Sequence, residues 1–128
     1  MITGAHILLY SEKPEVDRAF FRDVLGFPAV DIGEGWLIFA LPPSEAALHP
    51  SNGNTGQPHG GRHLLGAVLY LMCDDLPAYI KLLEAKNVRC TAISEEDWGT
   101  KTTIPLPSGG EIGLYQPTHP TALDLNAN

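Results

Sequence analysis

Histidine and cysteine side chains are the first places to look for chemistry in this sequence. His59 and His63 have the spacing that aligns two metal ligands on a helix, but the Gly60-Gly61-Arg62 between them predicts an exposed loop instead. Cys73 precedes Asp74-Asp75, whose carboxylates would raise the pKa of its thiol. We therefore expect Cys73 to be a buried structural residue and not a nucleophile.

Other reaction classes leave no motif in the 128 residues. There is no Gly-x-Ser-x-Gly nucleophile elbow and no glycine-rich phosphate loop. The formal net charge of -7 argues against binding to nucleic acid or to an anionic membrane surface. No apolar run reaches the roughly 20 residues that span a bilayer, and the start lacks the features of a signal peptide. With two cysteines only, we expect a cytoplasmic protein whose thiols are reduced.

The elements that must position any functional side chain form a pattern that occurs twice. Each half reads as a strand, a helix and three strands, and the segments 41–50 and 106–115 resemble each other. The first helix is expected after Ser11, a candidate N-cap, and ends before Gly26. Asp74-Asp75 supplies the cap of the second helix, which ends near Asn87. The expected strands are 5–10, 28–32, 36–41, 46–49, 64–73, 88–93, 101–106 and 112–116.

The pattern also sets the expected organisation of the chain. Residues 1–50 are the first module and residues 64–117 the second. Residues 51–63 are rich in glycine and asparagine, which is typical of a flexible linker. Residues 118–128 are expected to be a tail.

The sequence resembles the vicinal oxygen chelate (VOC) superfamily, which includes glyoxalase I, bleomycin-resistance proteins and extradiol dioxygenases. The resemblance covers about residues 3–117, and its most specific part is the end of the first helix, Arg22-Asp23-Val24-Leu25-Gly26-Phe27. Further matching segments are His6-Ile7-Leu8-Leu9-Tyr10, Glu45-Ala46-Ala47-Leu48-His49-Pro50, Cys73-Asp74-Asp75-Leu76 and Pro107 to Pro117. Within the family, the chain is most similar to small uncharacterised bacterial proteins.

This resemblance implies an α+β fold. Two βαβββ modules form a curved eight-stranded mixed sheet around a cleft, and the helices lie outside. The two modules together make one VOC domain, and many members of the family are homodimers. We therefore expect a homodimer here.

The resemblance also implies where a metal would bind, on the first and last strand of each module. His6, Ala47, Val68 and Gly113 occupy those positions here, and only His6 has a side chain that can ligate. A divalent metal needs three or more donors from protein. We therefore expect that the usual metal site is lost and that no cofactor is bound.

A displaced metal site is the alternative. Side chains alternate between the faces of a strand, so Glu45 and His49 share the face of Ala47, and Glu111 shares the face of Gly113. His6, Glu45, His49 and Glu111 would be a chemically suitable ligand set. Such a site would favour a metal-dependent lyase or dioxygenase, so whether the protein is an enzyme stays open.

The same alternation predicts an aromatic and apolar cleft face. We expect its ligand-binding residues to be His6, Leu8, Tyr70, Met72, Tyr115 and His49, with Trp36 or Trp98 beside them. Such a lining is usual for a small-molecule pocket, although the same residues could also pack as core. The sequence therefore predicts a glyoxalase- and bleomycin-resistance-like protein whose partner is a small hydrophobic or aromatic molecule.

Overall fold

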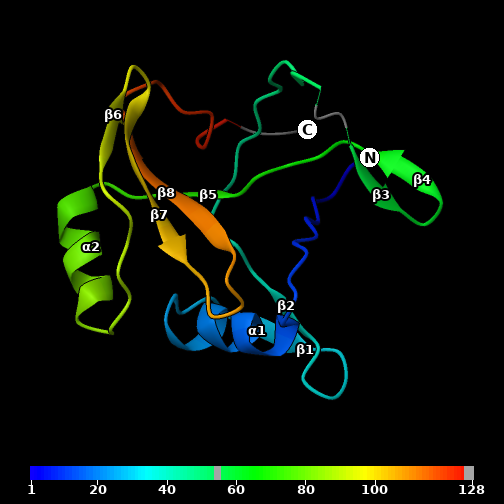
Figure 1. The fold of residues 1–128 in the computed structure, drawn as a ribbon. Coiled ribbons are helices and arrows are strands. Elements are labelled where there is room, and N and C mark those ends of the chain that lie inside the picture. Colours follow the sequence, from blue (N-terminus) through cyan, green and yellow to red (C-terminus); the bar gives the residue numbers. More distant parts are fainter. Residues whose placement is uncertain (54–55, 126–128) are drawn as a thin grey trace.

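The computed structural model describes residues 1–53 and 56–125, which form two helices and eight strands in open curved sheets (Figure 1). The elements are α1 (Pro14–Asp23), β1 (Ala29–Asp31), β2 (Leu37–Phe39), β3 (Gln57–His59), β4 (Arg62–Leu64), β5 (Tyr70–Met72), α2 (Leu76–Glu84), β6 (Ser94–Glu96), β7 (Gly99–Pro105) and β8 (Glu111–Pro117). The predicted α+β class is confirmed, with both helices outside the sheets.

The second half of the chain is a complete βαβββ unit. Its strands form one sheet in the order β5-β8-β7-β6, in which β5 runs parallel to β8 and the other pairs are antiparallel. Helix α2 begins as predicted, because the Asp75 carboxylate accepts a hydrogen bond of 3.1 Å from the backbone N–H of Ala78. This unit forms the rigid support of the candidate site.

One face of the four-stranded sheet is the hydrophobic core. Ile104, Ile112 and Leu114 point to this face, and both helices pack against it. Helix α1 contributes Phe20 and Phe21 because its apolar residues fall on one side. The buried residues of this cluster are Phe20, Phe21, Leu76, Leu83, Val88, Ile104, Ile112 and Leu114. The opposite face of the sheet is therefore left for function.

The first half is less regular than the sequence predicted. It contains α1 and the β1–β2 hairpin, but 5–10 and 46–49 form no strand in the described structure. In the second module the equivalent first and last strands, β5 and β8, pair with each other. The segment 41–50 holds Pro42, Pro43 and Pro50, which lack the N–H donors of a sheet ladder.

Two other strand predictions and the predicted linker also differ from the structure. The expected strand 64–73 is reduced to β5, the segment 88–93 is not a strand, and the predicted linker contains the hairpin β3–β4. Gly60 and Gly61, with φ of 56° and 77°, make its tight turn, since glycine adopts positive φ at little cost. The eight described strands are consequently hydrogen-bonded as sheets of four, two and two strands instead of one.

A buried carboxylate ties the first half to the second. Asp17 of α1 accepts hydrogen bonds from the hydroxyls of Ser11 and Ser108, both at 2.6 Å, and from the backbone N–H of Ser108 at 3.1 Å. The prediction that Ser11 caps the helix is wrong, because Lys13 occupies that position and the Ser11 hydroxyl is directed to Asp17. Ser108 lies in the turn between β7 and β8, so Asp17 fixes α1 to that turn.

Candidate ligand-binding site

The sheet face opposite the core presents the side chains that were predicted for the second module. In the register of β5 and β8, Tyr70 lies beside Gly113 and Met72 lies beside Tyr115. In the register of β7 and β8, Lys101 lies beside Tyr115. Since neighbouring residues in register share a face, Tyr70, Met72 and Tyr115 lie on one surface, as expected.

Three aromatic rings gather on this surface, and we call Tyr70, Trp98 and Tyr115 the aromatic cluster. Their ring centroids are 5.9 Å (Tyr70–Trp98), 5.6 Å (Tyr70–Tyr115) and 5.2 Å (Trp98–Tyr115) apart. The interplanar angles are 84°, 84° and 75°, so every pair is edge-to-face, the arrangement that aromatic quadrupoles favour. Tyr115 is buried, whereas Tyr70 and Trp98 are each 37% exposed and present free surface to a ligand.

The Tyr70 ring lies directly on Gly113. A Cβ atom at position 113 would overlap this ring, with the ring Cγ only 2.7 Å away. The ring cannot move aside freely, because Trp98 and Tyr115 border it. The family resemblance implies that metal-binding relatives carry a metal ligand at the position of Gly113. The Tyr70 ring therefore fills the space that a side chain at position 113 would occupy.

Tyr115 also has a polar contact that the sequence did not predict. Its hydroxyl lies 2.9 Å from Nε2 of His119, whose Nδ1 is 2.8 Å from the carbonyl oxygen of Pro120. A carbonyl only accepts, so Nδ1 donates to Pro120, and in the neutral imidazole Nε2 accepts from the Tyr115 hydroxyl. Burial, and then the charge of Glu45, raises the pKa of Tyr115 and keeps its hydroxyl protonated. His119 thereby holds the segment after β8 against the aromatic cluster.

Charged groups surround the aromatic cluster unevenly. The Lys101 ammonium lies 5.5 Å from the centroid of the Trp98 ring and 3.5 Å from Oε1 of Glu96. Glu111 shares the face of Gly113 and accepts a hydrogen bond from the Thr103 hydroxyl. Glu45 accepts a hydrogen bond of 2.7 Å from the backbone N–H of Ala122. Carboxylates therefore outnumber ammonium groups around the cluster.

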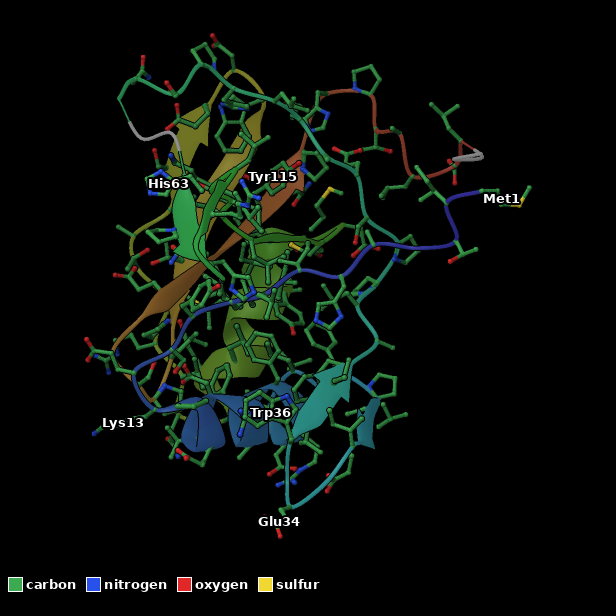
Figure 2. The ribbon with its side chains drawn as sticks, turned by 90° about the vertical axis from the view of Figure 1, so that its right-hand side faces the viewer. Met1, Lys13, Glu34, Trp36, His63 and Tyr115 are labelled. Carbon is green, nitrogen blue, oxygen red and sulfur yellow. The ribbon has the colours of Figure 1, made fainter. Side chains whose placement is uncertain are left out.

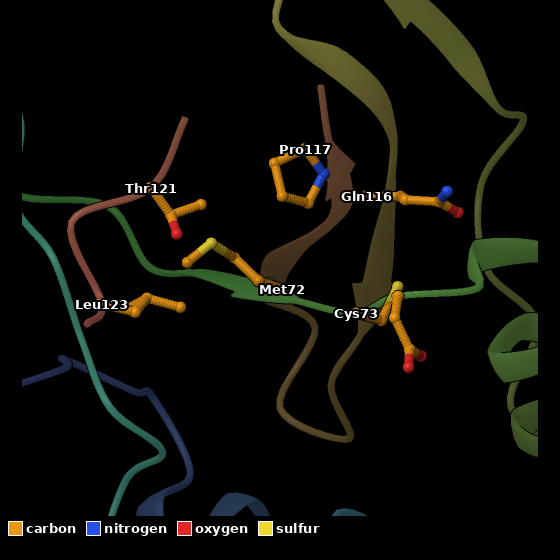
Figure 3. A pocket seen from close by; sticks show the side chains of 7 residues that line it. Met72, Cys73, Gln116, Pro117, Thr121 and Leu123 are labelled. Carbon is orange, nitrogen blue, oxygen red and sulfur yellow. The ribbon is translucent and has the colours of Figure 1, made fainter. Parts of the chain in front are cut away.

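A cavity of about 460 Å³ adjoins the cluster on the side of Met72 and Pro117 (Figure 3). In the close view, Met72 and Leu123 point toward each other across it, with Thr121 above them. Its other lining residues are Cys73, Asp74, Gln116 and Pro117. The cavity is open to solvent, and its lining combines apolar side chains with the polar Asp74, Gln116 and Thr121.

The first-half residues predicted for the site are not brought to the cluster. His6 and Leu8 lie in the irregular segment before α1, and His49 is exposed in another irregular segment. Nowhere in residues 1–53 and 56–125 do three or more His, Cys, Asp or Glu side chains group so that they could hold a metal ion. The displaced set of His6, Glu45, His49 and Glu111 is therefore not assembled in this arrangement of the chain.

The structure distinguishes the two tryptophans and defines the setting of Cys73. Trp36 lies over α1, with the Arg18 guanidinium 4.4 Å from the centroid of its ring. Figure 2 shows Trp36 beside α1, at the opposite end of the view from Tyr115. Cys73 is half-buried, and burial raises the pKa of its thiol, with smaller contributions from Asp74 and Asp75. The predicted direction is confirmed, although burial is the main cause.

Sequence reasoning missed Lys101 and His119 and left Trp98 undecided. Trp98 precedes Gly99, which pairs with Pro117 at the end of β8, and this register brings the indole to Tyr115. A correct pairing of β7 with β8 would have placed Trp98 and Lys101. His119 left no signal, because its contact depends on the path of the chain after β8.

Comparison with known proteins identifies the family. Residues 4–112 match the family model described as the Glyoxalase/Bleomycin resistance protein/Dioxygenase superfamily. The chain belongs to this superfamily. No match was found among curated proteins.

Solved structures agree with the superfamily fold. TnmS3, an antibiotic binding protein from Streptomyces sp. CB03234, has a TM-score of 0.59 and 21% identity, covering 92% of this chain and 100% of TnmS3. A lactoylglutathione lyase from Agrobacterium tumefaciens has a TM-score of 0.59 and 18% identity, covering 89% of this chain and 92% of the lyase. A glyoxalase/bleomycin resistance protein from Streptomyces sp. CB03234 has a TM-score of 0.53 and 21% identity, with coverages of 83% and 93%. These likenesses establish the fold alone.

As a member of the glyoxalase/bleomycin-resistance superfamily, the chain has a fold that supports both binders and enzymes. Its function must therefore be argued from its own site. Neither of its described helices has the length and apolar character needed to cross a membrane.

Proposed function

We propose that this protein binds a small hydrophobic or aromatic molecule and that it has lost the metal site of the superfamily. The observation that supports the proposal is the aromatic cluster. Its Tyr70 ring lies on Gly113, and the cavity lined by Met72 and Pro117 lies beside it. Ring faces supply contact area, and the polar tips of Tyr and Trp orient a ligand. Tyr70, Met72 and Tyr115 are its ligand-binding residues, and the similarity to an antibiotic-binding protein supports a binder.

The binding prediction concerns Tyr70. We expect planar aromatic compounds to raise the melting temperature of the protein, and nucleotides to leave it unchanged, because the negative net charge disfavours phosphates. Tyr70→Ala should weaken aromatic binding about fivefold, since it removes a ring–ring contact worth roughly 1 kcal/mol. Thermal-shift screening followed by calorimetry measures both effects.

Tyr79 provides the matched control for that experiment. It is a half-buried tyrosine on α2, on the other side of the sheet, so Tyr79→Phe should leave binding unchanged. Stabilisation by nucleotides and not by aromatic compounds would show that the site has been misidentified.

We also propose that the protein is a cytoplasmic homodimer. Segment 5–10 is apolar, its residues Ile7, Leu8 and Leu9 are 48%, 54% and 45% exposed, and no backbone pairing involves it among the described residues. An unpaired apolar edge is suited to pairing with a second chain, which would also bring His6 and Leu8 toward a site.

The dimer prediction is tested with Leu8→Lys, which places a charge in the apolar segment. We expect light scattering to give twice the chain mass for the wild type and at least tenfold weaker association for the variant. Leu82→Lys, at an exposed leucine of α2, should not change the mass. A monomeric wild type would contradict the proposal.

A further inference from the structure

We propose that the ligand of the aromatic cluster is a planar aromatic cation. This inference rests on the proposed function and specifies its ligand class. It follows from the orientation of the three rings, from the position of Lys101 and from the charges around them.

Tyr70 and Trp98 offer the accessible electron-rich ring surface of the aromatic cluster, because Tyr115 is buried and stacked against His119. Its three rings are nearly perpendicular in pairs, at 84°, 84° and 75°. A positive charge is attracted to such a face within about 6 Å of its centroid. The Lys101 ammonium already lies 5.5 Å from the centroid of Trp98. The protein therefore uses one of these faces to hold a cation of its own, and the half-exposed Tyr70 and Trp98 leave surface for another.

The charges around the cluster also favour a positively charged ligand. Glu96 and Glu111 lie on the strands of this face and Glu45 lies near Tyr115, whereas Lys101 is the one lysine of these four strands and pairs with Glu96. Three carboxylates against one ammonium leave an excess of negative charge.

The adjoining cavity and the chain as a whole also carry negative charge. Among the residues that line the cavity, Asp74 is the charged one, and it is acidic. The formal net charge of -7 attracts cations at long range. An aromatic anion would approach against this field and would have to displace Glu96 from Lys101, while a cation meets neither obstacle.

Three ligands of the same ring size test the sign of the charge. N-methylquinolinium is a cation, quinoline is neutral under mildly alkaline conditions, and quinoline carboxylate is an anion. By isothermal titration calorimetry we expect the cation to bind about fivefold more tightly than quinoline, and the anion more weakly than both. The cation preference should disappear in Trp98→Leu.

Lys101→Met gives the sharper test, because it removes the competing ammonium and keeps the apolar stem. We expect it to tighten N-methylquinolinium binding about threefold and to leave quinoline unchanged. Lys81→Met on α2 is the matched control, because it changes the net charge equally at an exposed site away from the cluster. It should leave all three affinities unchanged.

The outcomes separate this inference from the proposed function. Equal binding of the three compounds, or weaker cation binding in Lys101→Met, overturns the charge assignment and leaves an aromatic-binding site in place. If none of the three binds and no aromatic compound shifts the melting temperature, the proposed function itself is wrong.

Discussion

Gly113→Ala is expected to destabilise the protein by about 1–3 kcal/mol, although alanine is normally the better strand residue. The added Cβ would overlap the Tyr70 ring, whose Cγ lies 2.7 Å from the position of that atom. Trp98 and Tyr115 border the ring, so relief of the overlap requires the aromatic cluster to repack. Urea unfolding of the two proteins measures the difference in the free energy of unfolding.

A double-mutant cycle isolates the cause. In a Tyr70→Ala background the overlap is gone, and Gly113→Ala should be neutral or slightly stabilising. Gly110→Ala serves as a control, because a Cβ there meets only the Ser108 hydroxyl, at 3.7 Å. The same loss of stability at position 113 with and without Tyr70 would show that the ring does not exclude side chains from this position.

Asp17→Ala is expected to cost about 3 kcal/mol of the free energy of unfolding. The carboxylate is buried and accepts hydrogen bonds from both serine hydroxyls and from the backbone N–H of Ser108. Hydrogen bonds to a charged group are worth about 1.5–3 kcal/mol, and the variant leaves the Ser108 N–H without its acceptor. The urea midpoint at neutral pH reports the effect.

Asp23→Ala is the matched control on the same helix. Asp23 pairs with Arg22 at 2.7 Å, but both side chains are exposed, and such surface pairs contribute little. Ser108→Ala, which removes one hydroxyl and keeps the backbone donor, should fall between the two. Equal midpoints for Asp17→Ala and Asp23→Ala would mean that the tether between the halves does not stabilise the fold.

Within the second module, local patterns predicted α2, β7 and β8, whereas they missed β6 and made the strand before α2 too long. The repeat of apolar residues on α2, the Asp75 cap and the alternation along β8 each depend on residues close in sequence. These features placed Tyr70, Met72 and Tyr115 on one surface before the register was known.

The first module could not be predicted in the same way. Segment 5–10 has a strand-like composition, but a strand needs a hydrogen-bonded neighbour, and the proline-rich segment 41–50 does not supply one in the described structure. The placement of the Tyr70 ring on Gly113 also depends on the pairing of β5 with β8, which composition does not reveal. The roles of His6, Leu8 and His49 remain predictions.

The tether between Asp17 and Ser108 has a consequence for folding kinetics. The two residues are separated by 91 positions, so their contact closes a long loop, whereas β7 and β8 are joined by a short turn. The entropy of closing that loop is spent before the contact contributes energy. We therefore expect the carboxylate to form its hydrogen bonds late on the folding pathway. Loss of the carboxylate should then mainly raise the rate of unfolding. The rate of folding should change little, so the contact determines how long α1 stays docked.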